Sequence, residues 1–268
     1  MFLVFNICLL FLVHSSQAQA TKWILTWSDE FDEQSLDLSK WNVKTNVSHD
    51  EGHLHSELQL YLPEQIKLNH GHLQITAERE HVLDPNGKLW NFSSGWIDTQ
   101  NLFHQQYGRF ETNMSLPPES ATGIWPAFWL LPQNLSQCWP TGGEIDVFEF
   151  NGNPVADDVF ASYHWGRACG VDQAPIPGKS YMESDKDWQT AWHVYAVEWF
   201  KDRLDYYVDD VLYYTKTSQE VILPSSSMYV IINLAIDGLI FPPSETKGIY
   251  PAIMNVDYIR VYQDQAYL

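Results

Sequence analysis

Three acidic residues lie close together in the most strand-like apolar run of the chain. This run reads GGEIDVFEFNG from residue 142 to residue 152, and its acids are Glu144, Asp146 and Glu149. Carboxylates cost free energy to bury, so such a group marks either a reactive site or a solvated edge. A close pair of carboxyl groups can cleave glycosidic bonds: one attacks the anomeric carbon of the sugar, and the other protonates the leaving oxygen.

The spacing of these acids allows all of them to share one face of a β-strand. Side chains alternate with a period of two, which puts Glu144 and Asp146 on one face and Glu149 on the other. One extra residue, a β-bulge at Val147 or Phe148, returns Glu149 to the face of the other two. The glutamates can then lean toward the separation of about 5–5.5 Å that suits a retaining glycosidase. Three close acids resist joint ionisation, so at least one holds its proton to higher pH.

The pattern E-x-D-x-x-E alone also fits a solvated acidic face or a calcium site. Its neighbours favour a sugar site. Trp125 and Trp129, in GIWPAFWLLP, are four residues apart and would share a strand face, where indole rings stack on sugars or pack in the core. His164, in SYHWG, should lie on a nearby strand, where it either bonds an acid or a sugar hydroxyl or is structural.

The elements that must hold these residues are short strands. Runs of β-branched and aromatic residues recur between Gly, Pro, Asn and Asp, which is typical of a β-sandwich or barrel. We predict strands within residues 72–78, 107–116, 123–132, 144–150, 158–165, 192–200, 204–214, 228–236 and 254–262. Asp209-Asp210 predicts a tight hairpin turn. The apolar run 229–236 predicts a central strand covered by a second layer.

The N-terminus and the net charge bound the class of protein. Residues 1–20 are typical of a secretory signal peptide, because the apolar run 2–13 is too short to span a bilayer and small residues follow it. A buried core helix is the alternative. Residues 21–268 would then form a single extracellular domain, with no later stretch apolar enough to cross a membrane. The net charge of -19 disfavours nucleic acid and sulfated polymers as partners and permits neutral ones.

Two cysteines and four glycosylation motifs agree with secretion. Cys8 lies in the predicted signal peptide, which leaves Cys138 and Cys169. In an oxidising compartment they predict one disulfide, whose loop would contain the acidic strand; two free buried thiols are the alternative. The Asn-x-Ser motifs start at Asn46, Asn91, Asn113 and Asn134, and each can accept a glycan only if it is exposed.

The acidic run and its order among other segments resemble glycoside hydrolase family 16. The segments that carry the resemblance, besides GEIDVFE, are WSDEFD (27–32), SELQLY (56–61), YGRFE (107–111), WPAFWLLP (125–132), YAVEW (195–199), YYVDD (206–210), IINLAI (231–236) and VDYIRVY (256–262). The resemblance implies an all-β jelly roll of two curved antiparallel sheets with a concave substrate cleft. It also implies Glu144 as nucleophile, Glu149 as general acid/base and Asp146 as their helper.

Within the family, the bulged motif and WPAFWLLP are most similar to the laminarinase branch. This implies a secreted, retaining endo-glycosidase that acts on neutral β-1,3-glucan as a monomer, without a required cofactor. Trp125, Trp129, His164 and Glu57 match positions at or near the substrate. The chain departs from the laminarinase pattern at Ser56, Trp96 and residues 236–238, which affects the prediction of the exact substrate. The alternatives are a non-catalytic glucan-binding lectin, a transglycosylase, and a family hydrolase that acts on another β-glucan or on a galactan.

The resemblance also implies a metal away from the acids. Glu30 and Asp257 match the region where some family members hold a calcium ion on the convex side. Oxygen ligands from carboxylates and backbone carbonyls would suit this ion. It would be structural, because glycosyl transfer between two carboxyl groups needs no Lewis acid. The alternative is that Asp257 caps a strand or bonds a neighbouring loop.

Overall fold

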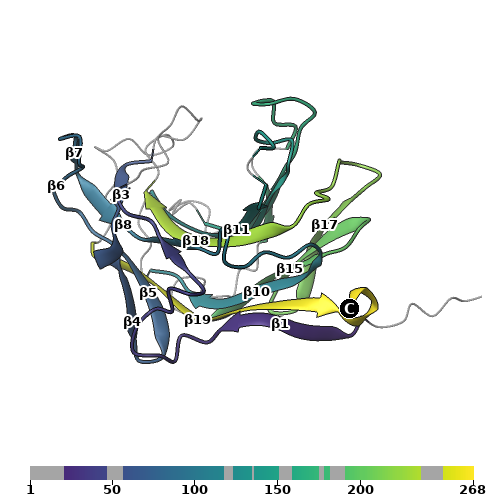
Figure 1. Cartoon of the computed structure of the whole chain (residues 1–268), viewed down its shortest axis with the longest axis horizontal. Coiled ribbons are helices and arrows are strands. Elements are labelled where there is room, and N and C mark those ends of the chain that lie inside the picture. Colours follow the sequence, from purple (N-terminus) through teal and green to yellow (C-terminus); the bar gives the residue numbers. More distant parts are fainter. Residues whose placement is uncertain are drawn as a thin grey trace, which may run out of the picture.

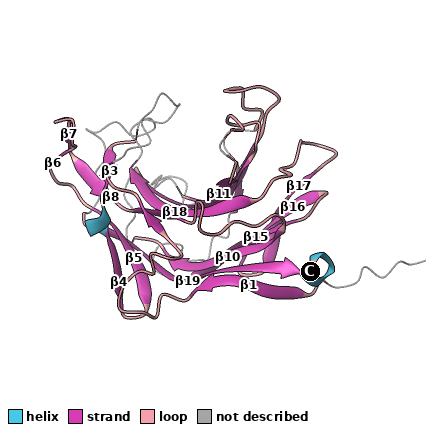
Figure 2. Cartoon of the chain, in the orientation of Figure 1, coloured by secondary structure: helices cyan, strands magenta, loops and turns pink. Residues whose placement is uncertain are grey.

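Almost all regular structure in the protein is β-strand, arranged in two layers (Figures 1 and 2). The structure is a computed structural model that describes residues 21–46, 57–117, 123–134, 136–150, 159–174, 178–181, 191–236 and 250–268. The predicted signal peptide, Ser56 and Asp237 lie outside these ranges. Within them, no helix has the length and hydropathy needed to cross a bilayer.

The larger sheet forms one layer. Its strands, in spatial order, are β17 (Val211–Thr217), β16 (Arg203–Val208), β15 (His193–Trp199), β10 (Gly108–Ser115), β19 (Ala252–Asp264), β5 (His72–Ala77) and β4 (Ile66–Asn69). β1 (Trp23–Asp29) also pairs with β19, antiparallel like the others. β19 is long enough to hold β1 and β5 along one edge and β10 along the other.

The second sheet forms the other layer and carries the acidic run. Its strands, in spatial order, are β14 (Lys179–Tyr181), β13 (Val159–His164), β12 (Glu144–Glu149), β11 (Ile124–Pro132), β18 (Met228–Ile236), β9 (Trp96–Asp98) and β2 (Asn42–Val43). Smaller elements are β3 (Gln59–Tyr61), β8 (Phe92–Ser94), β6 (Val82–Leu83), β7 (Leu89–Trp90) and the 3₁₀ turns η1 (Pro63–Gln65) and η2 (Gln265–Tyr267).

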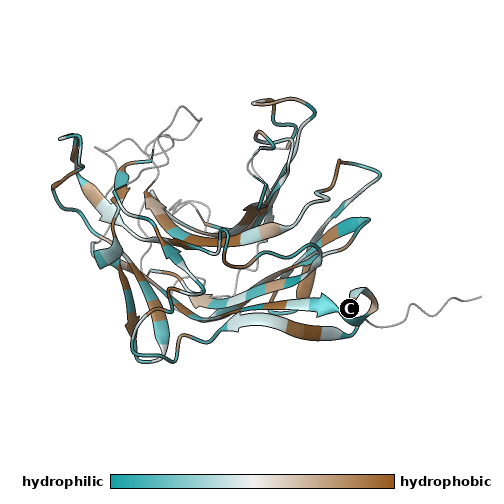
Figure 3. Cartoon of the chain, viewed as in Figure 1, coloured by the Kyte–Doolittle hydropathy of each residue, from teal (hydrophilic) through white to brown (hydrophobic). Residues whose placement is uncertain are grey.

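The main core lies between the two sheets. β18 shows how its sequence specifies this: every residue of the strand is buried, with even-numbered positions from Met228 to Ile236 in the main core. On its other face, Tyr229 and Ile231 join a smaller apolar cluster with Trp96 and Trp129. Figure 3 shows apolar positions recurring along the strands of both layers. The predicted central strand is confirmed, and so is the all-β jelly roll.

Every predicted strand range overlaps an observed strand. The hairpin between β16 and β17 turns at Asp209 and Asp210, whose φ angles of 49° and 62° match the left-handed conformation of a two-residue turn. Segments rise above both ends of the β11–β18 layer in Figure 1: β3, β6, β7 and β8 at one end, and the teal-green part of the chain between β11 and β15 at the other. The acidic strand β12 belongs to this layer.

Candidate active site

A β-bulge in β12 brings the three acids to one face of the sheet. Against β11, Phe148 lies opposite Phe128 and Asp146 lies opposite Trp129, so Val147 is the extra residue. β13 shows the same shift, because two residues separate Asp146 from Glu149 while one separates their partners. The predicted bulge is confirmed at the predicted position.

Burial shows which way each side chain of β12 points. Ile145, Val147 and Phe148 lie in the core between the sheets, including both residues of the bulge. Asp146 and Glu149 lie opposite Trp129 and Ala127 of β11, which belong to the smaller cluster on the other face of the sheet, and Glu144 is the most exposed of the three acids. The row of carboxyl groups that the spacing predicts therefore forms on the outer face of β12.

Glu144 is held by an indole from the preceding loop. Nε1 of Trp139 donates a hydrogen bond of 2.7 Å to Oε2 of Glu144, and His164 lies directly opposite on β13. Burial and the charge of Asp146 raise the pKa of Glu144 to about 8, while His164 and the Trp139 hydrogen bond act in the opposite direction. The hydrogen bond from Trp139 and the charge of His164 thus favour the ionised carboxylate that a nucleophile requires.

Glu149 is more buried than Glu144. It is 8% exposed, and Nε1 of Trp125 donates a hydrogen bond of 3.0 Å to its Oε1. Burial, followed by the charge of Asp146, raises the pKa of Glu149 well above its usual range, although His164 and Trp125 oppose this. A carboxyl group that keeps its proton at neutral pH is suited to general acid catalysis.

Asp146 lies between the two glutamates and faces His164. Its Oδ2 is 3.2 Å from Nε2 of His164, and Nδ1 of the same ring is 2.6 Å from Oδ2 of Asp172. Burial opposes a charge on His164, but contact with Asp146, and then the charges of Asp146, Glu144 and Asp172, raise its pKa to about 11. The ring is therefore an imidazolium that bridges two aspartates.

This cluster could also be read as a metal site. Among the described residues, one ligand atom each from Glu144, Asp146 and His164 lie within 4.8 Å of one another. His164, however, uses Nε2 on Asp146 and Nδ1 on Asp172. A ring that carries a proton on each nitrogen has no lone pair for a cation, so the arrangement fits acid–base chemistry better than metal binding.

The predicted sugar-binding residues occupy two different settings. Trp125 is partly exposed beside Glu149. Trp129 is only 7% exposed and packs edge-on against Trp96, with ring centroids 5.2 Å apart. It therefore belongs to the floor of the site, whereas Trp125 is placed to meet a ligand.

Glu57 is tied to the same floor through a chain of hydrogen bonds. Trp129 Nε1 donates to Asn233 Oδ1 over 2.7 Å, and Asn233 Nδ2 donates to the Tyr61 hydroxyl over 3.1 Å. That hydroxyl in turn donates to Glu57 Oε2 over 3.0 Å. Glu57 is 8% exposed, so it fixes the end of this chain at the side of the site opposite β12.

Sequence reasoning missed two residues that contact the predicted site. Trp139 holds Glu144, and Asp172 holds His164. Both lie in irregular loops, where no side-chain periodicity exists to orient a residue. The only available signal was that the predicted Cys138–Cys169 bridge closes a loop around β12. This disulfide is confirmed, with Cα atoms 5.4 Å apart.

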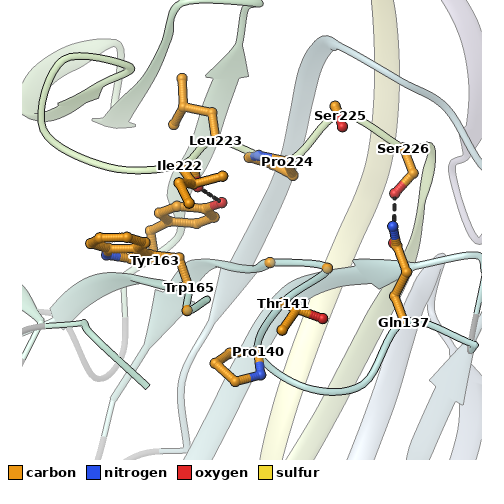
Figure 4. Close-up of a pocket in the computed structure, with 13 residues that line it drawn as sticks. Gln137, Pro140, Thr141, Tyr163, Trp165, Ile222, Leu223, Pro224, Ser225 and Ser226 are labelled. Carbon is orange, nitrogen blue, oxygen red and sulfur yellow. Dashed lines mark hydrogen bonds between the residues drawn. The ribbon is translucent and has the colours of Figure 1, made fainter. Parts of the chain in front are cut away.

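A pocket lies beside the start of β12 and is separate from the acid row. Gly143, just before Glu144, lines it together with Tyr163, Trp165 and the segment 222–226, and none of the three acids does (Figure 4). The Tyr163 hydroxyl donates a hydrogen bond of 2.7 Å to the carbonyl of Ile222 across it. The pocket therefore lies between the 222–226 segment and the end of β13. It does not extend the face of β12 that carries the three acids.

The two residues of the predicted calcium site have other partners. Both carboxylate oxygens of Glu30 bond Arg260, at 3.0 and 2.7 Å. Asp257 accepts a hydrogen bond of 3.1 Å from Asn113 and lies 3.4 Å from Nδ1 of His72. In this arrangement a calcium ion could reach Glu30 only by displacing Arg260 from both carboxylate oxygens. Calcium binding stays a prediction.

The glycosylation motifs differ in access. Asn91 and Asn134 are exposed, as is Asn46. Asn113 lies within β10, where its side chain is partly buried and donates to Asp257. Solvent exposure therefore favours Asn46, Asn91 and Asn134 as glycan acceptors over Asn113.

The chain is similar to known glucan hydrolases over nearly its whole length. It is 33% identical over 264 residues to "Glucan endo-1,3-beta-glucosidase A1" of Niallia circulans, covering 90% of this chain and 38% of that protein. It is 32% identical to "Beta-glucanase" of Rhodothermus marinus, covering 91% of this chain and 87% of that one. The chain thus spans well under half of the first relative and most of the second.

A solved structure shows the same fold. The catalytic domain of an endo-1,3-beta-glucanase (laminarinase) from Thermotoga petrophila RKU-1 superimposes with a TM-score of 0.79 and 31% sequence identity, covering 91% of this chain and 99% of that domain. The family model "Glycosyl hydrolases family 16" matches residues 39–259, which include the whole acid row. The protein is therefore a member of glycosyl hydrolase family 16, similar to its laminarinases.

Proposed function

We propose that the protein is a secreted, monomeric endo-glycosidase that hydrolyses β-1,3-glucan with retention of anomeric configuration. The observation that carries this proposal is the bulged strand β12, which sets Glu144, Asp146 and Glu149 in one row. The names of the relatives support the glucan substrate, and the net charge of -19 disfavours sulfated polymers. The Cys138–Cys169 disulfide supports an extracellular location, because such bonds persist in oxidising compartments.

The first step of the proposed reaction forms a glycosyl-enzyme. Glu144 attacks the anomeric carbon as a carboxylate, and the bond to the leaving sugar oxygen breaks. Glu149 donates its proton to that oxygen, so the departing sugar leaves as a neutral alcohol. Trp139 holds Oε2 of Glu144, and we assign the attack to Oε1.

The second step returns the enzyme to its starting state. Glu149, now a carboxylate, takes a proton from a water molecule, whose oxygen attacks the anomeric carbon from the opposite face. The bond to Glu144 breaks and the sugar leaves with its original configuration. Asp146 lies between the two glutamates, and its charge raises the pKa of both. Asp146 therefore helps Glu149 to hold the proton that it donates to the leaving oxygen.

Exchange of each glutamate for its amide tests the assignment. Glu144→Gln and Glu149→Gln should each lower turnover of laminarin by at least about a thousandfold, on the scale of a lost nucleophile or acid. Each variant should keep its fold, because an amide fills the same volume. Glu64→Gln, at an exposed position of η1, is the control and should retain full activity. Near-normal turnover by either site variant on every glucan would reject the proposal.

Azide separates the two roles. In Glu149→Ala, azide should attack the glycosyl-enzyme and give a β-glycosyl azide. In Glu144→Ala, it should enter the vacated space, displace an activated leaving group directly and give an α-glycosyl azide. The reverse pair of products would exchange the roles of the two residues. Binding of laminarin by the wild type without any release of reducing ends would instead identify a lectin.

A further inference from the structure

We infer that Asp172 is a positioning residue of the active site, which holds His164 as an imidazolium against Asp146. The inference rests on the proposed function and extends it to a residue outside the acid motif. The geometry that carries it is a line of contacts in which Asp172 Oδ2 lies 2.6 Å from Nδ1 of His164, and Nε2 of the same ring lies 3.2 Å from Oδ2 of Asp146.

Asp172 is itself fixed by the backbone around it. Its Oδ1 accepts hydrogen bonds from the backbone N–H groups of Trp165, at 3.3 Å, and Ala174, at 3.0 Å. The carboxylate is therefore oriented by one oxygen and faces His164 with the other. These backbone contacts leave the aspartate little freedom to turn away from the ring.

The disulfide ties the loop of Asp172 to the loop of Trp139. Cys169 precedes Asp172 by three residues, and its partner Cys138 precedes Trp139 directly. The backbone N–H of Gly170 also donates to the carbonyl of Trp139 over 2.8 Å. One covalently closed structure therefore supplies both the donor that holds Glu144 and the acceptor that holds His164.

The groups around His164 show what the contact does. β12 presents Glu144 and Asp146 to the ring, with Glu149 farther along the same row. The loop before β12 presents the uncharged ring of Trp139, 5.9 Å away between centroids. Asp172 is the negative group on the far side of the ring from this row. It therefore stabilises the proton on Nδ1, while the proton on Nε2 faces Asp146.

The imidazolium matters because its positive charge offsets the mutual repulsion of the three neighbouring acids. Its charge lowers the pKa of both Glu144 and Glu149, against burial and the charge of Asp146. Without the positive charge, Glu144 should ionise at higher pH and attack less often near neutrality. Asp172 thus acts on the reaction through His164 and needs no contact with the substrate.

Asp172→Asn tests the role with a small change in shape. Its Oδ1 can still accept from both backbone donors, but its amide presents a donor to Nδ1 of His164. The ring should then prefer its neutral form, with Nδ1 accepting. The matched control is Asp209→Asn, because Asp209 Oδ2 holds Nδ1 of His193 at 2.8 Å in a pair outside the acid row.

Nitrogen-15 NMR of the imidazole rings reads the effect independently of activity. The chain has ten histidines, and the signals lost in His164→Gln identify the ring. In the wild type both nitrogens of His164 should stay protonated from pH 5 to pH 8. In Asp172→Asn the ring should lose its second proton within that range, while in Asp209→Asn it should not. A wild-type ring that is neutral at pH 7, or an unchanged titration in Asp172→Asn, would overturn the inference.

Kinetics then show whether the contact serves catalysis. Asp172→Asn should lower kcat/KM on laminarin about 10- to 100-fold, the scale typical of partners that orient site histidines, and should move the acid limb of the pH profile to higher pH. In a His164→Gln background the same change should cost little more, because the two residues act as one unit. Additive losses would overturn the inference. If the wild type turns over no glucan, the proposed function fails, and the NMR result still decides the role of Asp172.

Discussion

The indole of Trp139 donates a 2.7 Å hydrogen bond to Glu144 from a loop that the Cys138–Cys169 disulfide closes. The acid that we assign as nucleophile is therefore held from outside its own strand. The bulge in β12 sets the direction of the acids, and the loop adds the hydrogen bond that favours an ionised Glu144. Strand and loop make separable contributions, which substitutions can measure one at a time.

Removal of the Trp139 donor should move the pH dependence of the reaction. Trp139→Phe keeps an aromatic ring and deletes a hydrogen bond to a charged group, a type of contact that contributes about 1.5–3 kcal/mol. The pKa of Glu144 should rise further, so the acid limb of kcat/KM should shift to higher pH and activity at pH 6 should fall at least about tenfold. Trp192→Phe, at an exposed ring beside His72, is the control. An unchanged profile in Trp139→Phe would contradict the role of the indole.

The raised pKa of Glu144 predicts a gain in stability when its charge is removed. A carboxyl group whose pKa rises to about 8 from 4.5 in the fold binds more protons when folded than when unfolded. Stability is therefore lost as the pH rises between those two values. Glu144→Gln should be at least about 1 kcal/mol more stable than the wild type at pH 8 and close to it at pH 4.

Urea unfolding at both pH values checks this difference, with Glu64→Gln as the exposed control. The control should differ equally little from the wild type at pH 4 and at pH 8. A Glu144→Gln variant that is less stable than the wild type at pH 8, or whose advantage shrinks as the pH rises, would show that the fold does not raise the pKa of Glu144.

Loss of the disulfide should weaken both the fold and the site. The bridge joins residues 31 positions apart, which corresponds to about 3–4 kcal/mol in the chain-entropy account of cross-links. The paired change Cys138→Ser and Cys169→Ser should lower the free energy of unfolding by that order and reduce activity under folding conditions. Mass spectrometry of the wild type should find no free thiol at either position. Two free thiols there, or an unchanged urea midpoint in the serine variant, would contradict the prediction.

The predicted calcium ion would bind at a distance from the acids. An ion held by the native state alone raises the melting midpoint by mass action. After chelation, millimolar calcium should therefore raise the midpoint of the wild type, and Asp257→Asn should remove the rise. Because Arg260 already takes both oxygens of Glu30, binding requires that pair to open. A constant midpoint across millimolar calcium would remove the site and leave the acid row unaffected.

Much of the fold was predictable because its strands follow simple rules. The period of two and the apolar runs placed the strands, and the run 229–236 favoured a central strand covered by a second layer. The bulge in β12 was predictable as well, since Glu149 could join Asp146 only with an extra residue between them. These predictions depend on alternation within one strand, which the sequence displays directly.

The contacts of the loops were not predictable by such rules. Asp172 lies eight residues after His164, and Trp139 lies five before Glu144. Neither spacing belongs to a strand or helix, so only the folded path of the loop brings the side chains together. Trp129 shows the same limit: its strand face was predicted, but its burial against Trp96 depends on a strand distant in sequence. The contacts of Trp139 and Asp172 were therefore missed, and for Trp129 only the strand face was predicted.

The anomeric configuration of the first product tests the central claim most directly. Proton NMR of laminarin hydrolysis, recorded within the first minutes before mutarotation, should show the β-anomer of the new reducing end appearing first, with the α-anomer rising later. This result follows if Glu144 forms a covalent intermediate that Glu149 then helps water to cleave. Initial appearance of the α-anomer would mean that water attacks directly, and would contradict the assignment of Glu144 as nucleophile.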